Sequence, residues 1–328
     1  MPHITFIHGI SNKPEAAALH DLWLRALARE NGPDCTTEGI TSSMVYWADV
    51  MYPAPETTVE PLESANEENE AQLAAASGDD SRWRHQLPPD ESAFVESLAA
   101  RLGADLPEEV APATESVRGK GGANESANLE AAELVALEAL ERIPLPWAIK
   151  RPLMKRLLRD VHHYLFNVDF RPRPGQSYRV QEEIRTRFVA KVKEGARNHG
   201  PHVVVSHSMG TVIAYDCLKR VPECPEVDAL FTLGSPLGLD EIQDKLKPEW
   251  RRDDGFPDKV GTAWVNVFDR LDPVAGFDPS FADDYLRHGQ QSVEDIHEPS
   301  WGKWRHSITK YLYGAKLRSR LTELLQPQ

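Results

Sequence analysis

The stretch from Val203 to Thr211 constrains the fold of this chain more than any other. Three consecutive valines, 203–205, predict a buried strand, because β-branched side chains favour the pleated surface of a sheet. The small residues after them let the chain turn sharply into a helix predicted over 212–218. A buried strand that runs directly into a helix is typical of a parallel sheet with helices packed on its faces. The pattern therefore predicts an α/β fold.

Ser208 stands at the turn between this strand and this helix. A serine at such a turn has its hydroxyl raised at the carboxyl end of the sheet, an arrangement called a nucleophile elbow. The elbow needs small residues two positions before and two positions after the serine, because strand and helix pass close together there. Gly210 meets the second requirement, and Ser206 is a small replacement for the usual glycine at the first. Ser208 is therefore the candidate nucleophile.

Composition limits the classes of partner. The 328 residues, 41% of them hydrophobic, are enough for one large domain or for one domain with an inserted cap. A formal net charge of −14 repels phosphate backbones, so nucleic acid is not expected as a partner. We find no signal-peptide pattern at the N-terminus and no apolar stretch long enough to span a bilayer.

The chain has three cysteines, Cys35, Cys217 and Cys224. Their number is odd and their spacing matches no metal or redox motif, so we interpret them as reduced thiols in a cytoplasmic protein. His162 and His163 are adjacent, and adjacent helical residues face different directions, so they do not indicate a metal site. We expect neither a metal nor a cofactor.

Two motifs carry a family resemblance. Phe-Ile-His-Gly-Ile at 6–10 follows a predicted strand over 3–7, and His-Ser-Met-Gly at 207–210 forms the predicted elbow. Together they resemble the α/β-hydrolase superfamily, in particular its bacterial lipase-like members. The resemblance covers the strand framework and implies that the backbone N–H groups of Ile10 and Met209 form an oxyanion hole. It also implies a trimmed, mainly parallel sheet that lacks the first two strands of the full fold. An ordinary turn after the strand, capped by His8, is the alternative interpretation of residues 8–12.

Four residues are expected to contact a substrate: His8, Gly9, Trp47 and Leu237. His8 and Gly9 follow the strand predicted over 3–7, and Trp47 is the last residue of the strand predicted over 43–47. Open α/β sheets bind ligands at the carboxyl ends of their strands. Leu237 belongs to a Gly-Ser-Pro-Leu loop that resembles a loop of the same family. A core position for Trp47 is the competing interpretation.

The segment 53–175 is predicted to be an inserted helical cap, and residues 1–52 and 176–328 the α/β-hydrolase core. Its first part, to about residue 142, is strongly acidic and contains a predicted helix over 128–143. A basic amphipathic helix follows over 146–161. Its apolar stripe either packs on the body of the protein or, with the charges from Lys150 to Arg159, touches a lipid surface.

A serine nucleophile needs a carboxylate that orients the histidine base, and two acids compete for that role. Both Asp269 and Asp272 follow a strand predicted over 263–268. Asp272 precedes a proline, which favours an extended conformation that can direct its side chain towards the elbow, and the Asp-Pro-Val loop resembles that of the family. We therefore choose Asp272, with Asp269 as a residue that braces the loop.

The general base is expected near the C-terminus. His306 lies just before a predicted C-terminal helix, as in the resembling family, and His297 and His288 are the alternatives. The order Ser208, Asp272, His306 is the one that this fold uses. The resemblance thus implies a serine hydrolase that cleaves small-molecule or lipid carboxylic esters. A phospholipase acting at a membrane, an acyltransferase or thioesterase, and a catalytically inert binding protein remain alternatives.

Overall fold

The computed structural model describes residues 1–36, 39–57, 83–84, 87–102, 147–275, 278–301 and 304–326. These residues form a six-stranded sheet with the order β2-β1-β5-β6-β7-β8, in which every neighbouring pair is parallel. The strands are β1 (His3–Ile7), β2 (Thr41–Val45), β5 (His202–His207), β6 (Val227–Leu233), β7 (Val260–Phe268) and β8 (Val293–His297). The predicted α/β class is confirmed.

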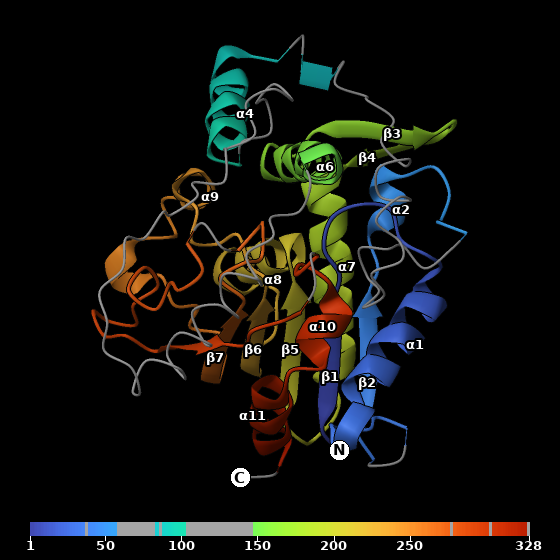
Figure 1. Cartoon of the computed structure of the whole chain (residues 1–328), viewed down its shortest axis with the longest axis vertical. Helices are drawn as coiled ribbons and strands as arrows, with labels where there is room; N and C mark the ends of the chain where they lie inside the picture. Colours follow the sequence, from blue (N-terminus) through green and yellow to red (C-terminus); the bar gives the residue numbers. More distant parts are fainter. Residues whose placement is uncertain are drawn as a thin grey trace, which may run out of the picture.

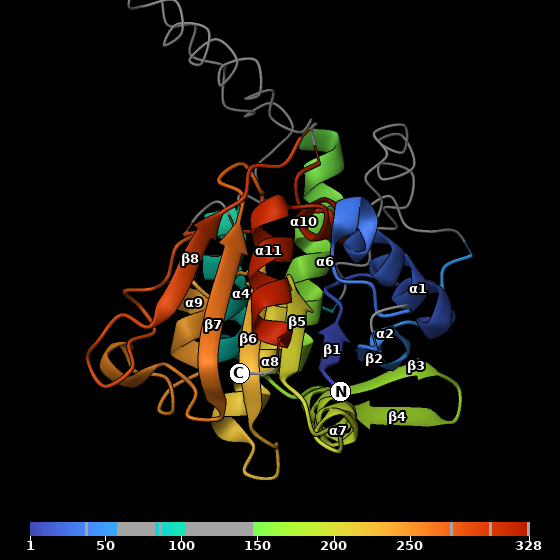
Figure 2. The ribbon, with the colours of Figure 1, turned by 90° about the horizontal axis from the view of Figure 1, so that it is seen from below.

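Helices cover both faces of the sheet, as Figure 2 shows. One face carries α1 (Ala16–Leu27), α10 (Ile308–Leu312) and α11 (Ala315–Leu325), and the other carries α7 (Val180–Gly195) and α8 (Met209–Arg220). The valines of β5 divide between the two cores: Val203 and Val205 pack with the first group, and Val204 with the second. A strand buried on both faces needs an unbroken apolar run, which is why this part of the sequence was informative.

A further group of elements lies beyond the carboxyl ends of the strands, at the top of Figure 1. They are α2 (Ala48–Met51), α4 (Pro89–Leu102), α6 (Trp147–Leu165), the antiparallel pair β3 (Asp169–Arg173) and β4 (Gln176–Arg179), and α9 (Asp240–Lys245). Two 3-10 helices, η1 (Arg29–Asn31) and η5 (Arg252–Asp254), complete the described elements. The helix predicted over 128–143 lies outside the described residues, and the division into core and cap stays a prediction.

The amphipathic helix predicted over 146–161 is present as α6. Met154, Leu157, Leu158 and Val161 are buried, so the apolar stripe packs inside the protein as the first interpretation expected. In the part of the chain that the structure describes, no helix combines the length and the apolar character needed to cross a membrane.

Several element boundaries differ from the prediction. Strand β2 ends at Val45, so Trp47 follows it and precedes α2 instead of closing the strand. A helix that the sequence predicts over 178–196 begins instead at Val180, as α7, because Tyr178 pairs with Phe170 in the β3-β4 hairpin. The hairpin and the edge strand β8 were not predicted, since their residues are mostly exposed or half-buried and they lack the apolar run that marks a fully buried strand.

A buried carboxylate joins three helices. Asp216 on α8 accepts two hydrogen bonds from the Arg185 guanidinium of α7, at 2.6 and 2.7 Å, and one from Tyr164 of α6 at 2.6 Å. Arg220 adds a contact at 3.1 Å. Burial and the Asp216 charge raise the pKa of Tyr164 well above its ordinary value, so this hydroxyl stays a donor. The carboxylate is therefore fully paired in a setting where loss of pairing is costly.

We predict that Asp216→Ala lowers the free energy of unfolding by about 3 to 5 kcal/mol, because it leaves two guanidinium groups and a buried hydroxyl without their acceptor. Asp21→Ala, which removes an exposed ion pair with Arg25 on α1, serves as control and is expected to cost about 0.5 kcal/mol or less. Urea denaturation of the two variants measures both values. Equal losses would contradict the role given to Asp216.

Helices α4 and α6 meet at a pair of buried histidines. The Nδ1 atoms of His162 and His163 lie 3.1 Å apart, and His162 Nε2 is 2.7 Å from Glu91 Oε2 of α4. The two rings thus meet instead of diverging, contrary to the expectation for adjacent helical residues. Burial, followed by the neighbouring His162, lowers the pKa of His163 to about 3.

Because the pKa of His163 is lowered, we predict that the protein loses stability in acid. Between the ordinary histidine pKa of about 6.5 and the folded value of about 3, the unfolded chain binds a proton at position 163 that the folded protein does not. Stability therefore falls as the pH falls through this range. His163→Gln is expected to make the pH dependence shallower, by at most about 1.4 kcal/mol per pH unit, when unfolding is measured between pH 4 and 6.5. His199→Gln, at an exposed position, is the control, and an unchanged slope in His163→Gln would refute the assignment.

Candidate active site

The backbone at Ser208 has the conformation expected of an elbow. Its φ is +53° and its ψ −127°, a region that residues with a side chain rarely adopt, and its hydroxyl lies between β5 and α8. The Ser208 N–H donates to the Leu233 carbonyl at 2.9 Å, and the Thr211 hydroxyl donates to the Ser208 carbonyl at 2.6 Å. These contacts hold a strained residue in place, as is usual where the strain serves a site.

Close backbone approach explains the small residues around the serine. A Cβ on Gly210 would lie 2.6 Å from the His8 carbonyl oxygen, so no larger residue fits without displacement of the backbone. Ser206 fits where glycine was expected because its Oγ donates to the Phe231 carbonyl of the adjacent strand at 2.6 Å.

Three residues from separate parts of the chain form a continuous hydrogen-bonded chain. His306 Nε2 lies 2.8 Å from Ser208 Oγ, although 98 positions separate them in sequence. His306 Nδ1 lies 2.8 Å from both carboxylate oxygens of Asp272. Because a carboxylate accepts, Nδ1 carries the proton and Nε2 is free to accept from the serine hydroxyl. The structure thus brings together the three residues predicted as catalytic, and all three are buried.

The Asp272 carboxylate is held as an anion. Tyr311 donates its hydroxyl at 2.6 Å, and the backbone N–H groups of Val274 and Ala275 donate at 2.7 and 3.2 Å. Burial by itself would raise the pKa of Asp272, but the charge and the hydrogen bond of His306, together with the hydrogen bonds from Tyr311 and Val274, hold this pKa below its ordinary value. An ionised carboxylate is what stabilises an imidazolium beside it.

The competing acid, Asp269, has the bracing role that was its alternative. Its carboxylate accepts from the N–H groups of Leu271 and Ser300 at 2.9 and 2.7 Å and pairs with Arg305 at 3.2 Å. The guanidinium that pairs with Asp269 belongs to Arg305, the neighbour of the histidine. Asp269 therefore stabilises both loops that carry the hydrogen-bonded chain. His297 lies on the edge strand β8 and His288 is largely exposed.

Sequence reasoning missed several side chains that hold the histidine. The His207 ring lies 4.7 Å from the His306 ring between centroids, and Trp304 contacts it edge-on at 5.8 Å. Burial, followed by the charge of His306, keeps the pKa of His207 well below its ordinary value, so this ring stays neutral. Tyr311 was also missed, because its hydrogen bond to Asp272 spans 39 positions. Tyr311 lies on α10, five positions after His306.

The loop after β1 lies directly against the serine. A Cβ on Gly9 would be 2.6 Å from Ser208 Cβ, and the Gly9 carbonyl accepts from His8 Nδ1 at 2.8 Å. His8 Nε2 accepts from the Trp47 N–H at 3.0 Å, and the two rings stack at 4.8 Å. Burial and the charge of Lys13 lower the pKa of His8 far below its ordinary value, which suits a neutral ring with one donor and one acceptor.

The four predicted substrate contacts lie near or inside the core. Gly9 contacts the serine, whereas His8, Trp47 and Leu237 are buried, and the Leu237 carbonyl accepts from Tyr285 and Gln243. Their contact with a substrate stays a prediction. Among the residues that the structure describes, no protein acceptor takes the N–H of Ile10 or of Met209, the first residue of α8.

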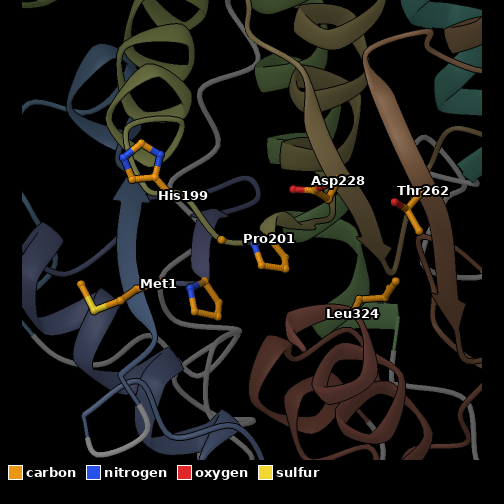
Figure 3. A pocket seen from close by; sticks show the side chains of 8 residues that line it. Met1, His199, Pro201, Asp228, Thr262 and Leu324 are labelled. Atoms are coloured by element: carbon orange, nitrogen blue, oxygen red, sulfur yellow. The ribbon is translucent and has the colours of Figure 1, made fainter. Parts of the chain in front are cut away.

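Two further observations concern other kinds of site. No group of three or more metal-binding side chains is found within the described ranges. A cavity of about 430 Å³ lies at the amino ends of the strands, the end opposite to Ser208. Pro201, Asp228 and Thr262 line it (Figure 3). It contains none of the residues predicted for the site.

Comparisons with known proteins add little. No protein-family profile and no curated protein matches the chain. A solved structure described as an uncharacterized protein from Pseudomonas aeruginosa is 12% identical, over 91% of this chain and 40% of that one, with a TM-score of 0.28. The chain thus spans less than half of that protein, and a similarity this weak supports no conclusion on fold or activity.

We predict that Gly210→Ala destabilises the elbow by about 1 to 3 kcal/mol, because the added methyl group meets the His8 backbone. Gly261→Ala on β7 is the control, since its nearest atom would be at an ordinary 3.6 Å, and it is expected to be close to neutral. Thermal unfolding of both variants makes the comparison. A neutral Gly210→Ala would show that the backbones are not held this closely.

Proposed function

We propose that this protein is a serine hydrolase of the α/β-hydrolase fold that cleaves carboxylic esters through an acyl-enzyme intermediate. The observation that carries the proposal is the buried chain from Ser208 Oγ through His306 to Asp272, with the serine in a strained elbow. A strained serine whose hydroxyl is within hydrogen-bond distance of an imidazole, with an ionised carboxylate behind that imidazole, is the arrangement that a serine nucleophile needs.

The residues imply a defined sequence of steps. Ser208 Oγ attacks the acyl carbon while His306 Nε2 takes its proton, and the tetrahedral intermediate places its oxyanion near the N–H groups of Ile10 and Met209. His306 then gives the proton to the leaving alcohol, and the acyl group remains on the serine. A water molecule, deprotonated by His306, attacks the acyl-enzyme, and the acid leaves as the serine regains its proton. No metal or cofactor enters this scheme.

The fold is consistent with this assignment. The candidate serine follows a central strand of an all-parallel sheet, and Asp272 and His306 follow it in the order that α/β-hydrolases use. The early His-Gly loop lies against the serine, where an oxyanion hole is needed. The sheet holds six strands, which suits the trimmed version of the fold.

The substrate proposed is a small-molecule or lipid ester, met in the cytoplasm. Interfacial action on phospholipids has less support, because the described apolar residues of α6 are buried and leave its charges as the available contact. Vesicle binding that disappears with added salt would favour it. Transfer of the acyl group to an added alcohol, in competition with water, would favour an acyltransferase, and preferred turnover of a thioester would favour a thioesterase. A chain-length series of esters defines the acyl preference.

Ser208→Ala is expected to lose labelling by a fluorophosphonate probe and to lower p-nitrophenyl ester turnover by about 10⁴-fold or more, because the nucleophile is gone. Labelling followed by peptide mass spectrometry identifies the modified residue. Ser235→Ala is the control. The hydroxyl of this buried serine is hydrogen-bonded to the Thr211 hydroxyl, with 2.7 Å between the oxygens, and the variant is expected to keep its labelling. Wild-type labelling of Ser208→Ala would overturn the assignment of Ser208 as the nucleophile. No labelling of the wild-type protein would overturn the proposed function and favour the inert binding protein.

A further inference from the structure

We propose that Asp160, on α6, is a positioning residue for the reaction, because it fixes the loop that supplies the Ile10 N–H to the oxyanion. This inference rests on the proposed function. It adds a buried carboxylate from the segment predicted as the cap to a site otherwise built from the sheet framework.

The Ile10–Ser11 peptide is held at both ends. Its carbonyl accepts from the Lys13 ammonium group, and its N–H donates to Asp160 Oδ2 at 3.0 Å, across 149 positions of sequence. Because the peptide unit is planar, any rotation of it would break both bonds at once. Ser11 itself has a φ of +72°, a conformation that a serine keeps only when its surroundings enforce it.

The preceding peptide is fixed as well. Its carbonyl, from Gly9, accepts from His8, and His8 is in turn fixed by the Trp47 N–H. The Ile10 N–H therefore belongs to the Gly9–Ile10 peptide, which His8 holds through the Gly9 carbonyl. The next peptide, Ile10–Ser11, is held by Asp160 and Lys13. A donor stabilises a developing charge well only when it is oriented in advance, and these contacts provide that orientation.

Asp160 is built to hold its position. It is 1% exposed, and besides Ser11 its carboxylate accepts from the Tyr52 hydroxyl at 3.0 Å and from the Arg159 guanidinium at 3.0 Å. Arg159 also stacks over the Tyr52 ring at 4.8 Å. The acid is thus anchored to Tyr52, the residue after α2, and to Arg159 of α6 at the same time as it holds the loop. Displacement of α6 would release the Ser11 N–H and with it the orientation of the donor.

The test compares two variants of the same helix. Asp160→Ala removes the acceptor of the Ser11 N–H, whereas Tyr164→Phe removes the bond from α6 to Asp216 and leaves the loop untouched. Asp160→Ala is expected to lower kcat for a p-nitrophenyl ester about tenfold or more, with KM changed less than about threefold, because the loss falls on the transition state. Tyr164→Phe is expected to keep kcat within about twofold at a comparable loss of thermal stability.

Asp160→Asn tests whether a neutral acceptor at this position restores part of the activity. Its amide oxygen can still accept from Ser11, so kcat is expected to lie between those of Asp160→Ala and the wild-type enzyme. A merely structural role would instead make kcat follow thermal stability across all three variants, and that outcome would overturn the inference.

Amide hydrogen exchange supplies a readout that does not depend on activity. Asp160→Ala is expected to increase exchange in the peptide that covers residues 9–13, and Tyr164→Phe is not. Unchanged exchange there would show that Asp160 does not hold the loop. Faster exchange with an unchanged kcat would refute the positioning role while leaving the hydrolase proposal intact, and a wild-type protein that neither turns over esters nor labels at Ser208 would refute the hydrolase proposal separately.

Discussion

The strained backbone at Ser208 is the constraint on which the rest of the structure depends. A positive φ at a serine is unfavourable, and it persists because β5, α8 and the loop after β1 meet there without room for rearrangement. Gly9 and Gly210 permit that meeting, and the hydrogen bond to Leu233 ties the serine to the next strand. Central strands buried on both faces provide the rigidity that this junction needs.

Asp269 and Asp272, two acids of one loop, bind different groups. Asp272 takes the imidazole, the Tyr311 hydroxyl and two backbone N–H groups, so its charge is fully solvated by the protein and available to a histidine that gains a proton. Asp269, three residues earlier, takes the Arg305 guanidinium and holds the segment that carries His306. One aspartate therefore belongs to the hydrogen-bonded chain of Ser208 and His306, whereas the other stabilises the loops that carry this chain, because the two carboxylates contact different groups.

Helix α6 is joined to the body through two buried carboxylates on different sides. Tyr164 donates to Asp216 at the α7-α8 layer, and Asp160 accepts from the loop after β1. The first contact stabilises the packing of helices, whereas the second reaches the residue next to a proposed oxyanion donor. A helix attached in this way can influence the chemistry of the site without contacting a substrate.

What the sequence by itself determined was local. The valine run of β5 and the small residues around Ser208 follow from short-range patterns, which backbone sterics and burial impose directly. The choice of His306 and the order Ser208, Asp272, His306 were implied by the family resemblance. The local pattern left Asp269 and Asp272 both open, and a family resemblance favoured the second. Only the tertiary structure decided which carboxylate meets the imidazole, that Tyr311 and His207 hold the site, and that Asp160 reaches Ser11. These are contacts between distant parts of the chain, and hydrogen bonds of this kind depend on three-dimensional packing that leaves no periodic trace in the sequence.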